Sequence, residues 1–154
     1  MNNLEEQIKT QFRKAFDDLL EESLKSDKPD WDWLTKLYKE LRDRICNLTP
    51  HRKDRIAEIY EHMDADLFHQ MVSNNAFDAE SMIKLVDYVF FRIRELEAPA
   101  RNPTTDAKLA ELKQIFFKEG TTFGSFVPQF LKFAHRRIDE IDDDKQKFLA
   151  QFKK

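Results

Sequence analysis

The stretch from Asp78 to Ala98 constrains the fold most, because large apolar residues recur in it at spacings of three and four. This period places them on one buried face of an α-helix. The residues concerned are Met82, Leu85, Val86, Val89, Phe90, Ile93 and Leu96. Asp78 is a preferred N-cap residue, and Pro99 disfavours the helical conformation for the residue before it. The sequence therefore predicts a central helix near residues 78–98, with Phe91 on the side opposite its apolar face.

Composition favours helices in the rest of the chain as well. Among 154 residues there are only two glycines, while 41% are apolar and 36% are charged. Such a mixture suits amphipathic helices and is poor in the residues that tight turns and sheets need. A chain of this length is expected to form one domain with its own core. We therefore predict an all-α fold, a compact single-domain bundle of about seven helices that spans residues 1–154.

Apolar periodicity and capping residues indicate where the other helices lie. A Thr-Pro pair at 49–50 and an Asn-Pro pair at 102–103 each read as an N-cap followed by proline at the first helical position. Ser125 is expected to cap the last helix, with Pro128 at the end of its first turn or at a kink. The expected helices cover about residues 3–24, 31–48, 50–63, 67–72, 102–119 and 125–152.

The first expected helix has an apolar pattern that differs from the others. Leu4, Ile8, Phe12, Phe16 and Leu20 step by four residues. In a helix of 3.6 residues per turn this step drifts by about 40° per repeat, so the apolar stripe winds around the helix. Such a helix either crosses over its neighbours or docks against a second copy of the chain, and the sequence leaves both alternatives open.

Two tryptophans open the second expected helix. Trp31 and Trp33 lie about 200° apart around a helix, so they cannot both face one core. One of them is expected either to pack as a lid or to face a partner. Together with Phe91, these residues are the aromatic candidates for contact with another protein.

Charge and cysteine usage limit the environment of the chain. The net charge of −3 provides no global basic field that would attract nucleic acid. Cys46 has no second cysteine with which to pair, so it is expected to be a small core residue in a reducing compartment. The N-terminal stretch is too polar for a signal or transit peptide, and no apolar run is long enough for a membrane span. We expect a soluble cytoplasmic protein without membrane contact.

No catalytic or metal-binding motif emerges from the sequence. His62 and His69 lie seven residues apart, whereas zinc sites typically use tighter pairs, and Asp64 and Asp66 are interpreted as helix caps. The acidic run at 139–144 lacks the glycine and glutamate of a calcium loop, so it is interpreted as a solvated helix face. Nucleophile motifs and glycine-rich phosphate loops are absent from the sequence. We predict no enzymatic activity, no cofactor and no metal.

A local basic cluster is the strongest charge feature. It consists of Arg42, Arg44, Arg52, Lys53 and Arg55, interrupted by two aspartates. These side chains either form a basic surface for acidic proteins, phosphopeptides or RNA, or pair with carboxylates of neighbouring helices. The sequence favours the second alternative and keeps Arg42, Arg44, Arg52 and Arg55 as candidates for partner binding.

Several short motifs occur in an order that resembles the T-complex protein eleven family. They are Glu40-Leu41-Arg42, Thr49-Pro50, Met63-Asp64 and the run Leu96-Glu97-Ala98-Pro99-Ala100-Arg101. The resemblance covers about residues 40–106 and suggests a family-like core at 34–119. It assigns structural roles to Leu41, Arg42, Pro50, Asp64, Ala98, Pro99 and Arg101. Two positions depart from the family pattern, because Glu97 stands where Cys is common and Asn102 where Asp is typical.

The resemblance implies a fold and a role that periodicity alone does not show. Members of the family are all-helical, have no established catalytic activity and are linked to cyclic-AMP and protein kinase A signalling. The implied function is a non-enzymatic scaffold whose partners are components of kinase signalling.

Two alternatives remain at this stage. One is a structural protein that assembles as a homodimer, and the other is a weak RNA or phosphopeptide binder that uses the arginines. Nucleic acid is the least favoured partner because the net charge is negative. Arg101 is expected to fix the corner after the central helix, with Asp64 or Asp66 as its acidic partner.

Overall fold

The computed structural model describes residues 2–152 as a set of α-helices and one 3-10 helix (η1) joined by short connections. No strand occurs among these residues, and the predicted all-α fold is confirmed. The elements are α1 (Asn2–Lys25), α2 (Trp31–Asn47), α3 (Lys53–His62), α4 (Ala65–Ser73), α5 (Ala79–Leu96), η1 (Pro99–Arg101), α6 (Asn102–Phe117) and α7 (Phe123–Phe152).

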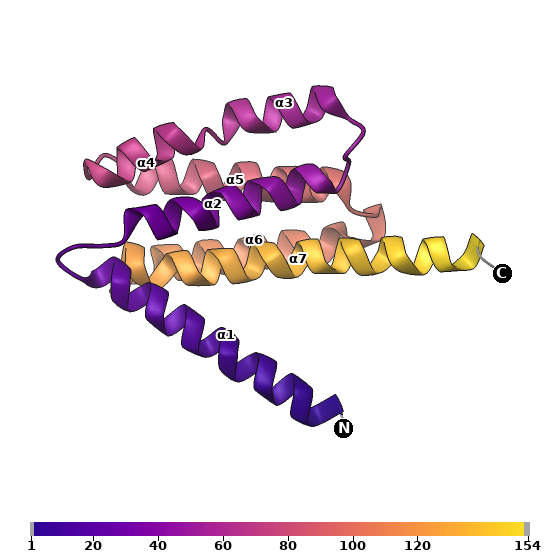
Figure 1. Cartoon of the computed structure of the whole chain (residues 1–154), viewed down its shortest axis with the longest axis horizontal. Helices are drawn as coiled ribbons and strands as arrows, with labels where there is room; N and C mark the ends of the chain where they lie inside the picture. Colours follow the sequence, from indigo (N-terminus) through magenta and orange to yellow (C-terminus); the bar gives the residue numbers. More distant parts are fainter. Residues whose placement is uncertain (1, 153–154) are drawn as a thin grey trace.

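The core lies between α2, α5, α6 and α7. In the view of Figure 1, α3 and α4 lie above α2 and α5, and α6 and α7 lie below them. Helix α7 packs against α1, α2, α5 and α6, so it holds the bundle together as much as α5 does. Most of the predicted apolar face of α5 is fully buried, with Leu85 and Leu96 at its margin. Phe90, Phe126 and Phe130 are among the largest buried side chains.

Aspartates begin three of the helices, and two of them, Asp64 and Asp78, are caps that the sequence predicts. The carboxylates of Asp30, Asp64 and Asp78 accept hydrogen bonds from the backbone N–H groups three residues later, at 3.0, 3.0 and 2.9 Å. Each bond satisfies one of the N–H groups that have no partner inside the helix. The hydrogen bond from the Ser81 N–H also lowers the pKa of Asp78 below its ordinary value.

Two predicted helix starts are wrong. The Thr-Pro pair at 49–50 forms a turn in which the Arg52 N–H donates to the carbonyl of Thr49, and α3 begins only at Lys53. Proline suits such a turn as well as a first helical position, because its φ is fixed near the value that both require. The Thr49 hydroxyl is buried without a hydrogen-bond partner, so it caps nothing.

Helix α7 begins earlier than expected because Thr122, and not Ser125, is its N-cap. The Ser125 N–H donates to the Thr122 hydroxyl at 3.1 Å, and the Thr122 N–H donates to the Ser125 hydroxyl at 2.9 Å. This reciprocal pair is a capping box, and it places Pro128 inside the helix. Gly124 lies so close to α1 that a Cβ atom there would come within 2.9 Å of Lys25.

Helix α1 contacts the body of the protein mainly through its last turns. Leu20 and Leu24 are buried, whereas the apolar residues of the first four turns are exposed. Figure 1 shows α1 diverging from the other helices toward the N-terminus, and the end of α7 extending beyond them. The four-residue step of the apolar stripe explains this geometry, because only one end of a winding stripe can face a straight neighbour. Within residues 2–152, no helix combines the length and the apolar character that crossing a membrane requires.

Candidate functional site

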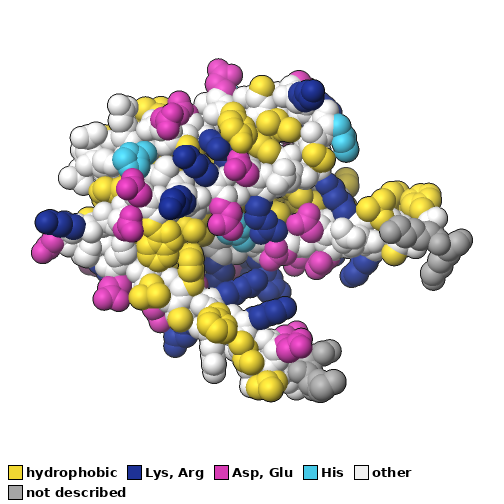
Figure 2. Space-filling view, viewed as in Figure 1, with side chains coloured by type: hydrophobic (Ala, Val, Ile, Leu, Met, Phe, Trp, Pro, Cys, Tyr) yellow, Lys and Arg dark blue, Asp and Glu magenta, His cyan; other side chains and the backbone are white. Residues whose placement is uncertain are grey.

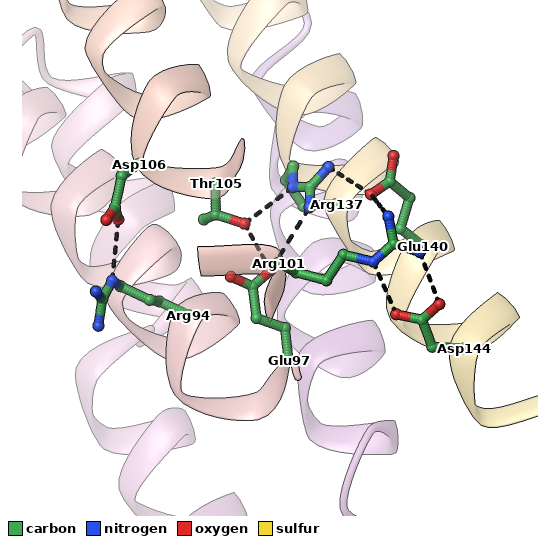
Figure 3. A network of polar contacts seen from close by, with 8 residues as sticks. All are labelled: Arg94, Glu97, Arg101, Thr105, Asp106, Arg137, Glu140 and Asp144. Carbon is green, nitrogen blue, oxygen red and sulfur yellow. Dashed lines mark hydrogen bonds and ion pairs between the residues drawn. The ribbon is translucent and has the colours of Figure 1, made fainter. Parts of the chain in front are cut away.

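A buried polar network joins the end of α5, η1, the start of α6 and the middle of α7. We call it the polar corner, and Figure 3 shows most of its members. At its centre the Glu97 carboxylate has no exposed surface and accepts a hydrogen bond from the Thr105 hydroxyl at 2.5 Å. The corner consists of Glu97, Arg101, Asn102, Thr105, Arg137, Glu140 and Asp144.

Arg137 connects α7 to this carboxylate. Its side chain is only 2% exposed, its Nε donates to the Thr105 hydroxyl at 3.0 Å, and its Nη1 donates to Glu140 at 2.7 Å. Its Nη2 lies 3.6 Å from the nearer Glu97 oxygen, close enough for an ion pair but without a hydrogen bond. A buried guanidinium is tolerated only when carboxylates compensate for its lost hydration. Arg137 and Glu97 therefore depend on each other.

Arg101 closes the corner toward the surface, but not with the partner that the sequence suggested. Its Nε and Nη2 donate to the two carboxylate oxygens of Asp144, at 3.1 and 2.8 Å. These bonds lower the pKa of Asp144 and raise that of Arg101. The expected pairing with Asp64 or Asp66 is wrong, because η1 sends Arg101 toward α7 while Asp64 caps α4.

The two departures from the family pattern contact each other. When the Asn102 amide is oriented to satisfy its surroundings, its nitrogen donates to Glu97 at 2.7 Å and to the Arg94 carbonyl at 3.2 Å. An aspartate at position 102 would instead place a second carboxylate beside the first. Asn102 is therefore compatible with Glu97 because it supplies a hydrogen-bond donor where the family pattern has an acceptor.

The remaining residues that the resemblance singled out lie apart from one another. Leu41 is buried in the core, and Arg42 lies over the ring of Tyr60 at 3.9 Å and pairs with Asp43. Pro50 lies in the turn before α3, whereas Ala98 and Pro99 begin η1 and are exposed. These residues shape turns and packing, and only Arg101 belongs to the polar corner.

The predicted arginine candidates are engaged by carboxylates. Arg44 donates to Asp139 at 2.8 Å and contacts Asp142 at 3.3 Å, and it also hydrogen-bonds His135 at 2.9 Å. Arg52 pairs with Asp54, and Arg55 pairs with Glu95 at 2.8 Å. The acidic run of α7 is thus not simply a solvated face, because four of its carboxylates bind arginines of other elements or of α7 itself.

The predicted metal-ligand residues are held separately. His62 stacks on the ring of Tyr88 and hydrogen-bonds the Glu58 carbonyl, while His69 contacts Asp32 at 2.9 Å. Within residues 2–152, no group of three or more His, Cys, Asp or Glu side chains is arranged to hold a metal ion.

The tryptophans face different neighbours, as their spacing requires. Trp33 packs edge-on against Phe16 of α1, and Trp31 packs edge-on against Phe123 of α7. Trp31, Phe123 and Phe77 line a cleft of about 710 Å³ between the α1–α2 connection, the end of α4 and the start of α7. We call this the aromatic cleft. Trp31 and Trp33 are both half-buried, so each combines a packing role with an accessible edge.

Phe91 lies on the outer side of α5, opposite the apolar face as predicted, and the structure shows that it is exposed. It stands between two ion pairs, Asp87 with Lys113 of α6 and Glu95 with Arg55 of α3. It does not line the aromatic cleft, so it presents a single exposed aromatic ring between charged side chains.

Sequence reasoning missed Arg137, Thr105 and Glu97 as a connected set. One signal was present, because Arg137 stands on the same helical face as the buried Ala134 and Ile141. A charge on an apolar stripe indicates a buried partner. The identity of that partner depended on how η1 turns the chain, which no local pattern specifies.

These observations define the class of protein as all-α. Most ionisable groups of the polar corner and of the arginine cluster form ion pairs within the fold. The accessible surface instead includes aromatic and apolar side chains. The sequence profile of T-complex protein 11 matches residues 1–136, well beyond the predicted stretch of 40–106. The chain belongs to the T-complex protein 11 family.

A human T-complex protein 11 homolog is 31% identical over 102 residues. These residues make up 66% of this chain and 20% of that protein, so the chain spans about a fifth of the relative that it matches. No solved structure is detectably similar to the chain.

Proposed function

We propose that the chain is a non-enzymatic, cytoplasmic interaction module that binds a protein of the cyclic-AMP and protein kinase A pathway. Membership of the T-complex protein 11 family, which is not a known enzyme family, supports the non-enzymatic role. The class of partner follows from the kinase-signalling link that the resemblance implies. The observation that carries the proposal is the aromatic cleft, with Trp31 at its edge.

The aromatic cleft has the features of a site for a protein side chain or a short peptide. Its volume of about 710 Å³ lies within the usual range of ligand sites. Trp31, Phe77 and Phe123 supply apolar walls, while Asp27 and Lys28 stand at the rim. Tryptophan is among the residues that contribute most to protein interfaces, because it buries a large area with few rotatable bonds.

Phosphate recognition is a weaker proposal for the same chain. A phosphopeptide or RNA site needs guanidinium groups that are free to form paired hydrogen bonds with phosphate. Arg44, Arg52 and Arg55 already contact carboxylates, so a phosphate would have to displace them.

The test is direct binding of purified protein kinase A subunits, regulatory and catalytic in separate experiments, to the immobilised chain. We expect one subunit to bind and Trp31→Ser to weaken that binding at least about tenfold, as loss of an aromatic anchor does. Phe91→Ser is the control, because it removes an exposed aromatic ring that lies outside the cleft. Absence of binding by both subunits, or a loss caused by Phe91→Ser and not by Trp31→Ser, would overturn the proposal.

A further inference from the structure

A second cleft, distinct from the aromatic cleft, lies between α4 and α5. Its volume is about 350 Å³, which is within the usual range of ligand sites. Leu67 and Met71 of α4 stand on one side of it, and Leu85 and Tyr88 of α5 stand on the other. Leu67 is 52% exposed, so part of this apolar surface is open to a partner. We call this cleft the α4–α5 groove.

Aromatic rings that pack on one another form the floor and the two ends of the groove. Tyr38 of α2 and Phe68 of α4 stack beneath it with ring centroids 4.2 Å apart, and both side chains are buried. At one end His62 stacks on Tyr88 at 4.9 Å, and at the other end Phe77 packs edge-on against Phe68 at 5.1 Å. Side chains that are already held by their neighbours lose little further freedom when a ligand binds. The groove is therefore largely preformed.

The two walls favour a helix as the occupant. Leu67 and Met71 are about one turn apart, and Ser81, Leu85 and Tyr88 follow over about two turns of α5, so the groove is about 10 Å long. Because helices satisfy their own backbone hydrogen bonds, neither wall offers an edge with which an extended segment could pair. An amphipathic helix needs no such edge and can lay its apolar face between the walls.

The charge around the groove determines which kind of helix fits. Glu61 and Asp64 line the groove. Figure 2 shows acidic side chains along the upper edge of the molecule, over α3 and α4. Between residues 56 and 83 the sequence contains no lysine and no arginine, but it contains the carboxylates of Glu58, Glu61, Asp64, Asp66, Asp78 and Glu80. The groove is thus apolar inside and acidic around its rim.

The cations near the groove are already paired. Lys84 lines it and lies 3.2 Å from Glu80, and Arg92 is only 5% exposed and lies 2.7 Å from Glu58. Arg42 pairs with the aspartate that follows it. Within residues 2–152, the other four carboxylates of the acidic stretch form no ion pair with a cation of the chain. A lysine or arginine of a partner would therefore meet available carboxylates, whereas phosphate groups of RNA or of a lipid surface would be repelled.

We propose that the α4–α5 groove binds a basic amphipathic helix of a partner protein. The apolar side chains of that helix fill the space between Leu67 and Leu85, and its lysines or arginines pair with Glu61 and Asp64. The apolar walls and the carboxylates contribute different parts of this recognition. The walls select a helix with one apolar face, and the carboxylates select the sign of its charge.

This site is separate from the one proposed in the aromatic cleft. Phe77 lines both, whereas Leu67 and Glu61 line the groove and not the aromatic cleft. The experiments below change Leu67 and Glu61 and leave Phe77 and Trp31 as they are. Either proposal can therefore fail without the other.

The probe is a fluorescently labelled peptide of about 16 residues, long enough to form a helix, in which leucines lie on one helical face and lysines on the other. We expect it to bind the whole chain with a Kd of about 10 µM, measured by fluorescence anisotropy. A second peptide has the same composition in an order that scatters the leucines around the helix, and a third has glutamate in place of each lysine. Each of these two is expected to bind at least about tenfold more weakly.

Two variants of the chain, each with a matched control, locate the binding. Leu67→Ser is expected to weaken binding of the first peptide at least about fivefold, because less apolar area is buried. Leu149→Ser is its control, since Leu149 is 53% exposed but lies near the end of α7. Glu61→Lys is also expected to weaken binding at least about fivefold. Its control is Glu119→Lys, which makes the same change in net charge at an exposed position outside the groove.

Three results would overturn the proposal, provided that circular dichroism shows all variants to be folded. The first is a leucine–lysine peptide that fails to bind, or that binds no more tightly than the scattered peptide, since net charge then explains any attraction. The second is an equal loss of binding in either variant and its control. The third is self-association of the chain in sedimentation velocity that Leu67→Ser abolishes, because a second copy would then cover the groove.

Discussion

The polar corner and the first turns of α1 use their side chains in opposite ways. In the corner, charged groups such as Arg137 and Glu97 are almost fully buried and are bound by one another. Along α1, apolar groups such as Phe12 and Leu19 are exposed, and charged groups stand beside them largely without partners in the chain. The usual distribution, with apolar groups inside and charges outside, is thus reversed in both places.

The two reversals have different physical consequences. A buried ion pair stabilises little by itself, but losing one member leaves a charge without hydration or a partner. An exposed apolar stripe contributes little to the stability of the monomer. Removing it changes the binding free energy only of a partner that covers it. The corner is therefore expected to set the stability of the fold, and the exposed stripe of α1 to contribute little to it.

The largest effect is expected from Arg137→Ala. This change removes the cation beside the buried Glu97 carboxylate and is expected to lower the free energy of unfolding by about 3–5 kcal/mol. Urea unfolding followed by circular dichroism measures it. A loss below about 1 kcal/mol would mean that Glu97 finds other compensation and that the corner does not control stability.

Two adjacent leucines of α1 give the next largest contrast. Leu20 is fully buried against the body, whereas Leu19 is 59% exposed. We expect Leu20→Ala to lower the free energy of unfolding by about 3 kcal/mol and Leu19→Ala by less than about 0.5 kcal/mol. Thermal unfolding at a concentration where the protein is monomeric measures both. Equal effects would show that the first turns of α1 pack on the body in solution.

Periodicity predicted most of the fold because the helices are amphipathic and few tight turns are needed. The apolar face of α5 and the caps at Asp64 and Asp78 follow from local rules, and the structure confirms them. The predicted starts of α3 and α7 were wrong because proline and hydroxyl residues occur in turns as readily as at helix caps. Distinguishing these roles depends on packing that local sequence does not contain.

The sites were less predictable than the fold. Phe91 lies opposite the apolar face of α5, and Trp31 and Trp33 diverge, as helical geometry predicted. The predicted partner of Arg101 was wrong because the actual partner, Asp144, is 43 residues away along the chain. Only the path of η1 and α6 brings the two side chains together. Long-range pairing of charges is set by the tertiary fold, and several acidic residues fit each arginine on sequence grounds alone.

A smaller effect is expected when one position is returned to the family pattern. Asn102→Asp replaces a donor to Glu97 by a second carboxylate and is expected to destabilise the fold by about 2 kcal/mol. Adding Glu97→Cys removes the repulsion, so the double variant should be more stable than the sum of the two single changes predicts. Urea unfolding of all four chains gives the coupling between positions 97 and 102. Additive effects would show that the two departures are independent.

The smallest effect concerns His135, which links the arginine cluster to α7. Burial, and then the nearby Arg44 guanidinium, lowers the pKa of His135 below its ordinary 6.5. The unfolded chain therefore takes up a proton at higher pH than the folded one, and stability falls as the pH drops below about 6.5 toward the folded-state pKa. We expect the difference in urea midpoint between pH 7.5 and 5.5 to shrink in His135→Gln. The control is Lys14→Glu, which should leave that difference unchanged because the Lys14 side chain is exposed. An equal change in His135→Gln and Lys14→Glu would show that the pH dependence does not arise from the buried imidazole.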